Sequence, residues 1–270
     1  MRLKSLLQVL GLRGRTRRYG YEMHDQDLGD GRIVHYAHWQ HPGEKPKRIT
    51  AEAVAAYTEL LDEGDFCLDI GAHSGDSTLP MAVAVGTEGR VLALEPNPHV
   101  FHVLQKNARA NRHLATIEPL LAAALPATGF AEFEYSDAGF CNGGRHEGIP
   151  AWRHGHAFKL AVFGVDLATE LATDYAAWLP RLRFVKVDAE GYDLYILRSL
   201  AGIIESRRPL VKAEVYKGTD RAYRRELLDF FRERDYVVHR VVQDPVAPGP
   251  ELTADDLERW PHYDILCRPR

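Results

Sequence analysis

One stretch of the chain combines two glycines, an acid and polar residues at a spacing that suits a nucleoside ligand. Asp69 ends an apolar run, and Gly71 and Gly75 follow in the pattern G-x-x-x-G before a second apolar run. A strand, a tight glycine turn and a helix start, in this order, form the ligand-binding end of a doubly wound sheet. A dinucleotide site needs G-x-G-x-x-G, whose middle glycine lets the backbone approach a pyrophosphate. His73 stands at that position, so the motif favours a nucleoside without a pyrophosphate, carrying a cationic group opposite Asp69.

S-adenosylmethionine fits this description, because it combines a nucleoside with a positively charged sulfonium. A second acid, Glu95, ends the next expected strand, where a carboxylate is placed to bind both ribose hydroxyls. Taken alone, Glu95 followed by Pro96 could equally be a surface acid that complements a helix dipole. His73 also has two interpretations: it tolerates an unusual turn conformation, or its ring stands over the ligand.

Charged residues end the fourth strand expected in the sheet, where ligands bind in open α/β proteins. Lys186 and Asp188 share one face of that strand, and Glu190 follows directly. In a structural interpretation, Lys186 is ion-paired with Asp188 or Glu190, because an unpaired lysine in an apolar strand is costly. In a functional interpretation, Asp188 or Glu190 removes a proton from a nucleophilic hydroxyl, and Lys186 positions the partners.

Other polar residues are candidates to bind a substrate. Glu214 and Tyr216 point the same way as Lys212 on the fifth expected strand, and Glu214 could instead pair with a neighbouring lysine. Asn142, in a glycine-rich loop, is a third candidate. Acids at these strand ends also offer oxygen ligands for a hard cation such as Mg²⁺. No motif with metal-ligand spacing accompanies them, so we predict no metal.

Alternating strands and helices must bring these residues together. We expect parallel strands over residues 66–70, 90–95, 117–124, 183–188 and 210–216. We expect helices over residues 50–61, 98–111, 192–204 and 220–233. Such βα units with apolar strands indicate a parallel sheet with helices on both faces. Two final strands, 236–242 and 263–267, are joined by a proline-rich connection, which favours an antiparallel end to the sheet.

Two segments depart from this alternation. Residues 1–49 are expected to form a basic N-terminal helix and an irregular lead-in with a strand at 32–39, ahead of a main domain over 50–270. Residues 126–165 are expected to be an inserted hairpin or lid. Leucines at helical spacing between basic residues allow peripheral membrane contact through residues 1–18, or docking on the chain's own domain or a partner subunit.

Composition limits the remaining function classes. The net charge of −4 argues against nucleic acid as a partner, since only the N-terminus is strongly basic. The three cysteines are far apart and lack C-x-x-C spacing, which indicates buried thiols in a reducing compartment. No segment has the roughly 20 apolar residues of a membrane span. The N-terminus is a poor signal peptide. We therefore predict a cytoplasmic protein, at the inner face of the membrane if residues 1–18 bind it.

Three motifs in series, D-I-G-A-H-S-G-D-S-T, V-L-A-L-E-P-N-P and V-K-V-D-A-E-G-Y-D, resemble those of FkbM-type S-adenosylmethionine-dependent methyltransferases, over about residues 50–245. The resemblance implies a Rossmann-like class I methyltransferase fold: a seven-stranded, mostly parallel sheet with an antiparallel last strand. His73 departs from the family, which usually has Asn there. By resemblance, Asp69, Gly71 and Gly75 would hold the methionine half of the cofactor, Glu95 the ribose, and residues around Ala123 and Ala124 the adenine. Ala72, His73 and Pro96 are further candidates to bind the cofactor.

The function that these observations predict is methyl transfer from S-adenosylmethionine to a sugar hydroxyl of a glycan, glycolipid or natural product, leaving S-adenosylhomocysteine. Residues 136–156 would close over the acceptor. Four alternatives remain: an N- or O-methyltransferase of a peptide or other small molecule, a NAD-dependent oxidoreductase, a non-catalytic adapter with the same fold, and a nucleic-acid methyltransferase. The missing G-x-G-x-x-G disfavours the oxidoreductase, and the acidic body disfavours the nucleic-acid enzyme. The acceptor and the oligomeric state are left open.

Overall fold

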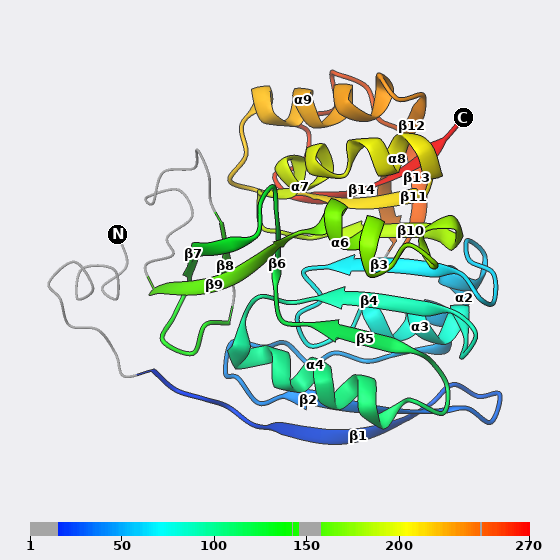
Figure 1. The fold of residues 1–270 in the computed structure, drawn as a ribbon, viewed down its shortest axis with the longest axis vertical. Helices are drawn as coiled ribbons and strands as arrows, with labels where there is room; N and C mark the ends of the chain where they lie inside the picture. Colours follow the sequence, from blue (N-terminus) through cyan, green and yellow to red (C-terminus); the bar gives the residue numbers. More distant parts are fainter. Residues whose placement is uncertain (1–15, 142, 146–157, 244) are drawn as a thin grey trace, which may run out of the picture.

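An eight-stranded, mostly parallel sheet forms the centre of the protein (Figure 1). The computed structural model describes residues 16–141, 143–145, 158–243 and 245–270. The strands run in the order β13-β12-β14-β11-β10-β3-β4-β5. Their bounds, along the chain, are β3 Phe66–Ile70, β4 Arg90–Leu94, β5 Ile117–Leu120, β10 Leu182–Val187, β11 Leu210–Val215, β12 Tyr236–Gln243, β13 Ala247–Glu251 and β14 Tyr263–Pro269.

The last strand is antiparallel, as predicted, but it lies inside the sheet. β14 is inserted between β11 and β12 and runs antiparallel to both. The structure also contains an edge strand that was not predicted: β13 lies in the segment that was expected to be a proline-rich connection. Pro248 and Pro250 lie in this strand, and an edge is the place where proline is tolerated in a sheet. The predicted Rossmann-like fold class is confirmed, with one strand more than expected.

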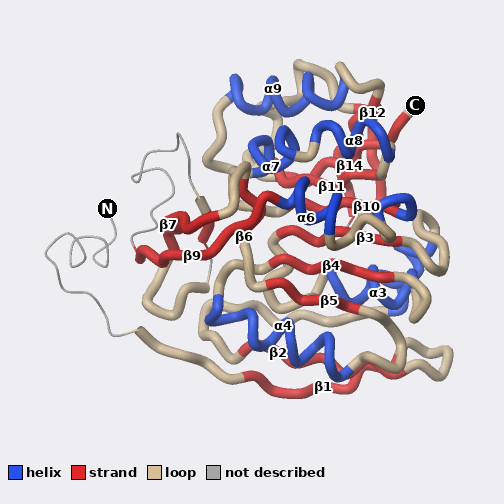
Figure 2. The backbone as a smooth tube through the Cα atoms, viewed as in Figure 1, coloured by secondary structure: helices blue, strands red, loops and turns tan. Residues whose placement is uncertain are grey.

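Helices cover both faces of this sheet (Figure 2). The core cluster on one face includes residues of α2 (Ala51–Thr58) and α3 (Thr78–Val85). The core on the other face includes residues of α6 (Leu167–Thr173), α7 (Asp193–Ser199), α8 (Ala201–Arg207) and α9 (Arg221–Arg232). Thr50 caps α2 as expected, since its side chain accepts a hydrogen bond from the Ala53 N–H. The helix expected over 192–204 is divided into α7 and α8 at Leu200.

An N-terminal hairpin, β1 (Tyr21–Asp27) and β2 (Ile33–Trp39), lies beside α4 (Pro98–Ala110). The sequence predicts a single strand, at residues 32–39, in an irregular segment here, and the structure has two. On its other edge, β2 pairs with the side chains of two asparagines of α4 and its end, where a neighbouring strand would otherwise lie. Asn107 accepts from the Ala37 N–H and donates to the Ala37 carbonyl, and Asn111 does the same with His35. The hairpin is thereby fixed next to the glycine turn, because Asn107 also donates to the Ser74 carbonyl.

A second, four-stranded sheet has the order β6-β9-β7-β8. Its strands are β6 Ala123–Leu125, β7 Gly129–Tyr135, β8 Gly143–Gly144 and β9 Phe158–Asp166. The single strand expected over 117–124 is therefore two strands: β5 stays in the main sheet, and β6 pairs with β9. Most of the predicted 136–156 loop and the predicted helix near the N-terminus lie outside the described residues. No helix in the described ranges is long and apolar enough to span a bilayer.

Candidate functional site

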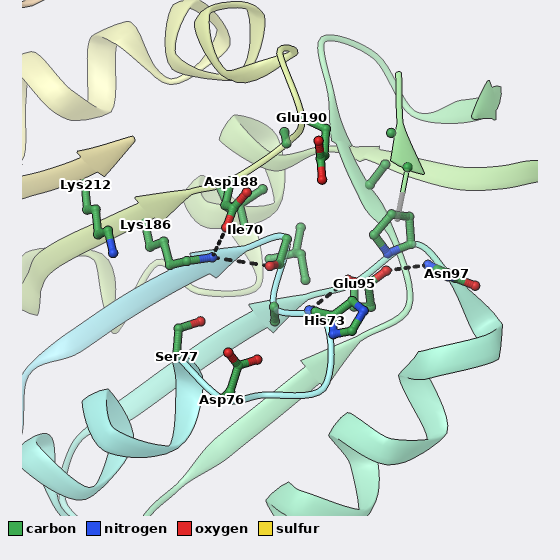
Figure 3. A pocket seen from close by; sticks show the side chains of 18 of the residues that line it. Ile70, His73, Asp76, Ser77, Glu95, Asn97, Lys186, Asp188, Glu190 and Lys212 are labelled. Carbon is green, nitrogen blue, oxygen red and sulfur yellow. Dashed lines mark hydrogen bonds and ion pairs between the residues drawn. The ribbon is translucent and has the colours of Figure 1, made fainter. Parts of the chain in front are cut away.

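A cavity of about 630 Å³ opens at the carboxyl ends of β3, β4 and β10. The turn after β3, the residues after β4, the start of β6 and the segment after β10 all contribute to its wall. Figure 3 shows Glu95 and His73 at one side of this space and Lys186 and Asp188 at the other. Of the residues predicted from sequence, the cavity wall includes Gly71, Ala72, His73, Glu95, Pro96, Ala123, Ala124, Lys186, Asp188 and Glu190.

The turn after β3 passes very close to the segment after β10. Gly71 has a φ of +81°, and a Cβ added there would lie 2.0 Å from the carbonyl oxygen of Asp188. The N–H groups of Gly71 and Ala72 both donate to the Leu94 carbonyl, which ties the turn to β4. A glycine is therefore required at 71 for its conformation and because the Asp188 carbonyl occupies the place that a Cβ would take.

We expect Gly71→Ala to destabilise the protein by about 1–3 kcal/mol, since the new methyl group meets backbone and the positive φ disfavours it. Cofactor binding should be lost as well. Chemical denaturation and ligand titration would measure the two effects. The matched control is Gly129→Ala, where an added Cβ meets nothing within 4 Å. Wild-type stability of the Gly71 variant would contradict the close approach described above.

Glu95 is buried at the end of β4 and is held by backbone donors. Its Oε1 accepts from the Asn97 N–H and its Oε2 accepts from the His73 N–H, each at 2.8 Å. Burial raises the pKa of Glu95 to about 7, although these two N–H groups oppose the shift. Each carboxylate oxygen keeps a second lone pair. The carboxyl group lines the cavity, so a pair of ligand hydroxyls can be recognised there.

His73 adopts a left-handed backbone conformation, with a φ of +48°. This supports the first interpretation of the residue, tolerance of an unusual turn. Its ring packs edge-on against Trp39, with centroids 5.5 Å apart. Burial and the Lys47 ammonium lower the pKa of His73, so the imidazole is neutral. Both ring nitrogens are shielded from solvent and make no hydrogen bond of normal geometry among the described residues, although the Cys141 backbone interacts with the ring and opposes the lowering of its pKa.

Asp69 does not reach the cavity wall formed by the described residues. It is fully buried beneath the turn, where its Oδ2 accepts from Ser77 at 2.8 Å and from Thr78 at 2.6 Å. Its Oδ1 lies 3.1 Å from the Lys186 ammonium. The cation that meets Asp69 in this structure is therefore a lysine. Gly75 also lies outside the described cavity wall, with a φ of +92°.

Lys186 connects the buried acid to the acids at the cavity. Its ammonium lies 3.4 Å from Asp188 Oδ2 and donates to the Gly71 carbonyl at 3.3 Å. Burial opposes the charge, but the carboxylates of Asp69 and Asp188 raise the pKa of Lys186 well above its usual value. The predicted pairing with Asp188 is present, and the pairing with Asp69 joins two strands that are far apart in sequence.

Glu190 has the properties of a proton acceptor. Burial and the neighbouring Asp188 carboxylate raise its pKa to about 7, against the opposing charge of Lys217. Its φ is +52°, an uncommon conformation for a residue with a side chain. Backbone strain of this kind is often found at functional sites. Asp188 differs, because 46% of its side chain is exposed and it is ion-paired with Lys186.

A second layer of acids lies behind this wall. Glu214 is buried with its Oε1 3.5 Å from His262, and it lies outside the described set of lining residues, as does Tyr216. Burial and Asp188 raise the pKa of Asp193 to about 8, and burial and the same neighbour raise the pKa of Glu214. Within the described ranges, no group of His, Cys, Asp and Glu side chains is arranged to hold a metal ion. Asn142 lies outside the described residues.

Several residues at the cavity were not predicted. Asp76 lies inside the glycine motif, and its charge there was a usable signal. Lys212 is paired in register with Lys186 on the neighbouring strand, so alternation could have found it. Lys47 and Asp264 come from outside the βα units, and no local pattern marked them. Lys212 and Asp264 form an ion pair, with 2.9 Å between the ammonium nitrogen and the carboxylate oxygen, so these two charges neutralise each other.

The cavity residues fit S-adenosylmethionine on three observations. Glu95 presents its carboxyl group to the cavity, the glycine turn contributes the small residues Gly71 and Ala72 to the wall, and the neutral ring of His73 has at least one buried nitrogen without a partner among the described residues. The wall near Ala123 and Ala124 is apolar and includes the ring of Phe133, which suits a flat base.

Comparison with known proteins identifies the family. Residues 69–238 match the profile described as "Methyltransferase FkbM domain". A curated relative, the hexuronic acid methyltransferase AglP of Haloferax volcanii, is 26% identical over 169 residues, and the match spans 63% of each chain.

Solved structures are more distant. A methyltransferase FkbM from Methylobacillus flagellatus KT has a TM-score of 0.45 and 17% identity, over 78% of this chain and 47% of that one. Aeropyrum pernix fibrillarin, solved with natively bound S-adenosyl-L-methionine, has a TM-score of 0.39 and 15% identity, over 94% and 96% of the two chains. These scores carry no argument about the site. The family match covers more than half of the chain, and the protein therefore belongs to the FkbM methyltransferase family.

Proposed function

We propose that this methyltransferase uses S-adenosylmethionine to methylate a hydroxyl group of a sugar. One observation carries the proposal: a single cavity joins Glu95, an acid suited to ribose hydroxyls, with Glu190, an acid whose pKa is raised to about 7. The first suits a nucleoside cofactor, and the second suits removal of a proton from a hydroxyl group.

In this proposal, the cofactor lies along the ends of β4 and β3. Ala123 and Ala124 contact the adenine, Glu95 accepts from the ribose hydroxyls, and the turn at Gly71 and Ala72 supports the amino-acid half. Asp69 acts from beneath the turn, through Ser77, Thr78 and Lys186, instead of touching the ligand. When bound, the cofactor supplies a methyl group on a positively charged sulfur.

Glu190 is the proposed general base. A base is most effective when its pKa lies near the working pH, and the raised pKa of Glu190 meets that condition. Asp188 is instead engaged by the Lys186 ammonium, 3.4 Å away, and is partly exposed. We assign Asp188 to hydrogen bonding with the acceptor, and Lys186 to positioning Asp188. Most of the remaining rate acceleration would come from holding the two substrates in alignment.

A sugar acceptor is supported by the relative that is named as a hexuronic acid methyltransferase. Because the two chains match over 63% of their lengths at 26% identity, this support concerns the acceptor class and not its identity. An N- or O-methyltransferase of a peptide would share every cofactor contact. Acceptor screening distinguishes the two, and so does mass spectrometry of glycans and lipids from a deletion strain, in which one methyl group should be missing.

Ligand binding tests the cofactor. S-adenosylhomocysteine should raise the melting temperature, because binding to the native state adds about 2.7 kcal/mol of stability at 100 times the Kd. Glu95→Ala should weaken this binding by about 10- to 100-fold through loss of charge-assisted hydrogen bonds, whereas Asp188→Ala should mainly lower turnover. No thermal shift with the wild type would remove the cofactor hypothesis. Weaker binding by the Asp188 variant than by the Glu95 variant would reverse the assigned roles.

A further inference from the structure

Three charged residues, Glu44, Lys47 and Asp76, form a group on the cavity wall beside the glycine turn. The Lys47 ammonium is 2.9 Å from Glu44 Oε1 and 2.9 Å from Asp76 Oδ1. All three residues line the cavity. Glu44 and Lys47 belong to the segment before α2, which we call the strap (residues 43–48), and Asp76 belongs to the glycine turn. The strap is thus joined to the turn at the cavity itself.

Neighbouring contacts fix this group in place. The hydroxyl of Ser74 donates to Asp76 Oδ1 at 3.3 Å, and the buried Tyr36 hydroxyl lies 3.1 Å from the same Ser74 oxygen. Glu44 is almost fully enclosed, with 5% of its side chain exposed. Burial opposes the charge on Asp76, but the Lys47 ammonium lowers its pKa, so both groups are charged at neutral pH. The group is therefore rigid, ionised and only partly solvated.

A partner for this group is indicated by the imidazole beside it. His73 Nδ1 lies 3.9 Å from Glu44 Oε1, beyond hydrogen-bond distance, and both ring nitrogens are buried. The Cys141 backbone can serve one of them, which leaves at least one buried nitrogen without a partner among the described residues. An unpaired buried nitrogen on a cavity wall indicates a ligand that supplies the missing partner. The ligand must therefore reach the strap side of the turn.

The direction of the cofactor leads to the same place. With its adenine near Ala123 and its ribose at Glu95, the cofactor in the proposed orientation continues past Gly71 and Ala72 toward the start of α3, where Asp76 and Ser77 also line the cavity. Figure 3 shows Asp76 and Ser77 pointing into the space on that side, away from Asn97. The amino-acid end of the cofactor carries an ammonium and a carboxylate on the same carbon, so it needs both signs of charge within a short distance.

We propose that Glu44, Lys47 and Asp76 form the subsite for the zwitterionic amino-acid end of the cofactor. Lys47 donates to the α-carboxylate, and Asp76 accepts from the α-ammonium, while Glu44 holds Lys47 and faces His73. A wall of one sign would attract one end of a zwitterion and repel the other, whereas alternating charges match both. This inference rests on the proposed cofactor, and it assigns binding residues to a segment outside the matched family domain, residues 69–238.

Binding of three ligands to two variants tests the subsite. The ligands are S-adenosylhomocysteine, 5′-methylthioadenosine, which lacks the amino-acid end, and decarboxylated S-adenosylmethionine, which lacks only the carboxylate. Lys47→Met should weaken S-adenosylhomocysteine by about 10- to 100-fold, because a charged hydrogen bond is lost, and leave the other two ligands within about twofold. Asp76→Asn should weaken both ligands that keep the ammonium, and leave 5′-methylthioadenosine unchanged.

Controls separate this inference from folding and from the proposed function. Lys159→Met removes the same charge from an exposed ion pair on β9, outside the described lining residues, and should leave all three affinities unchanged. If Lys47→Met does not fold, Asp76→Asn and Glu44→Gln make the same comparison between ligands. Equal weakening of 5′-methylthioadenosine and S-adenosylhomocysteine, or no weakening of either, would overturn the subsite. If the wild type binds neither ligand, the proposed cofactor itself is overturned.

Discussion

Glu190→Gln is expected to lower kcat for methyl transfer by about 10²- to 10⁴-fold, the usual contribution of a general base. Glutamine keeps the shape of the side chain but cannot accept the proton from the acceptor hydroxyl. Because Glu190 is assigned to the acceptor and Glu95 to the ribose, the affinity for S-adenosylhomocysteine should stay near its wild-type value. Single-turnover methyl transfer to a responsive acceptor, with cofactor at saturation, would measure the loss at the chemical step.

The pH dependence gives a second measurement of the same prediction. A general base works only when deprotonated, and the pKa of Glu190 is raised to about 7 by burial and by Asp188. The wild-type kcat should therefore rise with pH up to about 7 and level off above it. In Glu190→Gln this rise should disappear. A rise that persists in Glu190→Gln and vanishes in Asp188→Asn would instead make Asp188 the base.

Asp69→Ala is expected to destabilise the protein by about 3–5 kcal/mol, because it removes the partner of a buried charge. Asp69 is fully buried and lies 3.1 Å from the Lys186 ammonium. Its loss leaves that ammonium with Asp188, which is partly exposed, and leaves the hydroxyls of Ser77 and Thr78 without their acceptor. Denaturant unfolding followed by circular dichroism would give the change in free energy.

A double variant distinguishes the loss of an ion pair from a general packing defect. Asp69→Leu with Lys186→Met removes both charges, and apolar replacement of a buried ion pair is often nearly neutral for stability. We expect the double variant to recover most of the stability lost in Asp69→Ala. A double variant that is less stable than Asp69→Ala would show that a packing defect, and not the unpaired charge, causes the loss of stability.

The strands of the central sheet were predictable because their signals are local. The apolar run 66–70 is bounded by glycines, and β3 has those limits in the structure. The same holds for β4 and β11, which end within one residue of the prediction. β13 was not predicted, since its prolines disfavour a strand everywhere except at an edge. The change of sheet between β5 and β6 could not be read either, because pairing with β9 decides it.

Site residues were predictable where they come shortly after the end of a single strand. Glu95 follows β4 directly, Glu190 lies three residues after the end of β10, and both line the cavity. Asp69 was expected to meet a ligand, but the neighbouring strand supplies a cation for it. Lys186 is paired in register with Asp69, and this adjacency depends on the order of strands in the sheet. Strand order is a property of the whole fold, so single-strand patterns do not contain it.

The strap shows that the recognisable part of this sequence and the complete binding pocket have different limits. The family match begins at Asp69 and ends at residue 238. The pocket wall also uses Lys47, upstream of that range, and Asp264, downstream of it. A fragment cut to the matched range would keep the glycine turn, Glu95 and Glu190, yet it would lack the lining residues that come from outside that range. Comparisons confined to the shared segment therefore omit part of the pocket, and relatives with the same motifs can differ in that part.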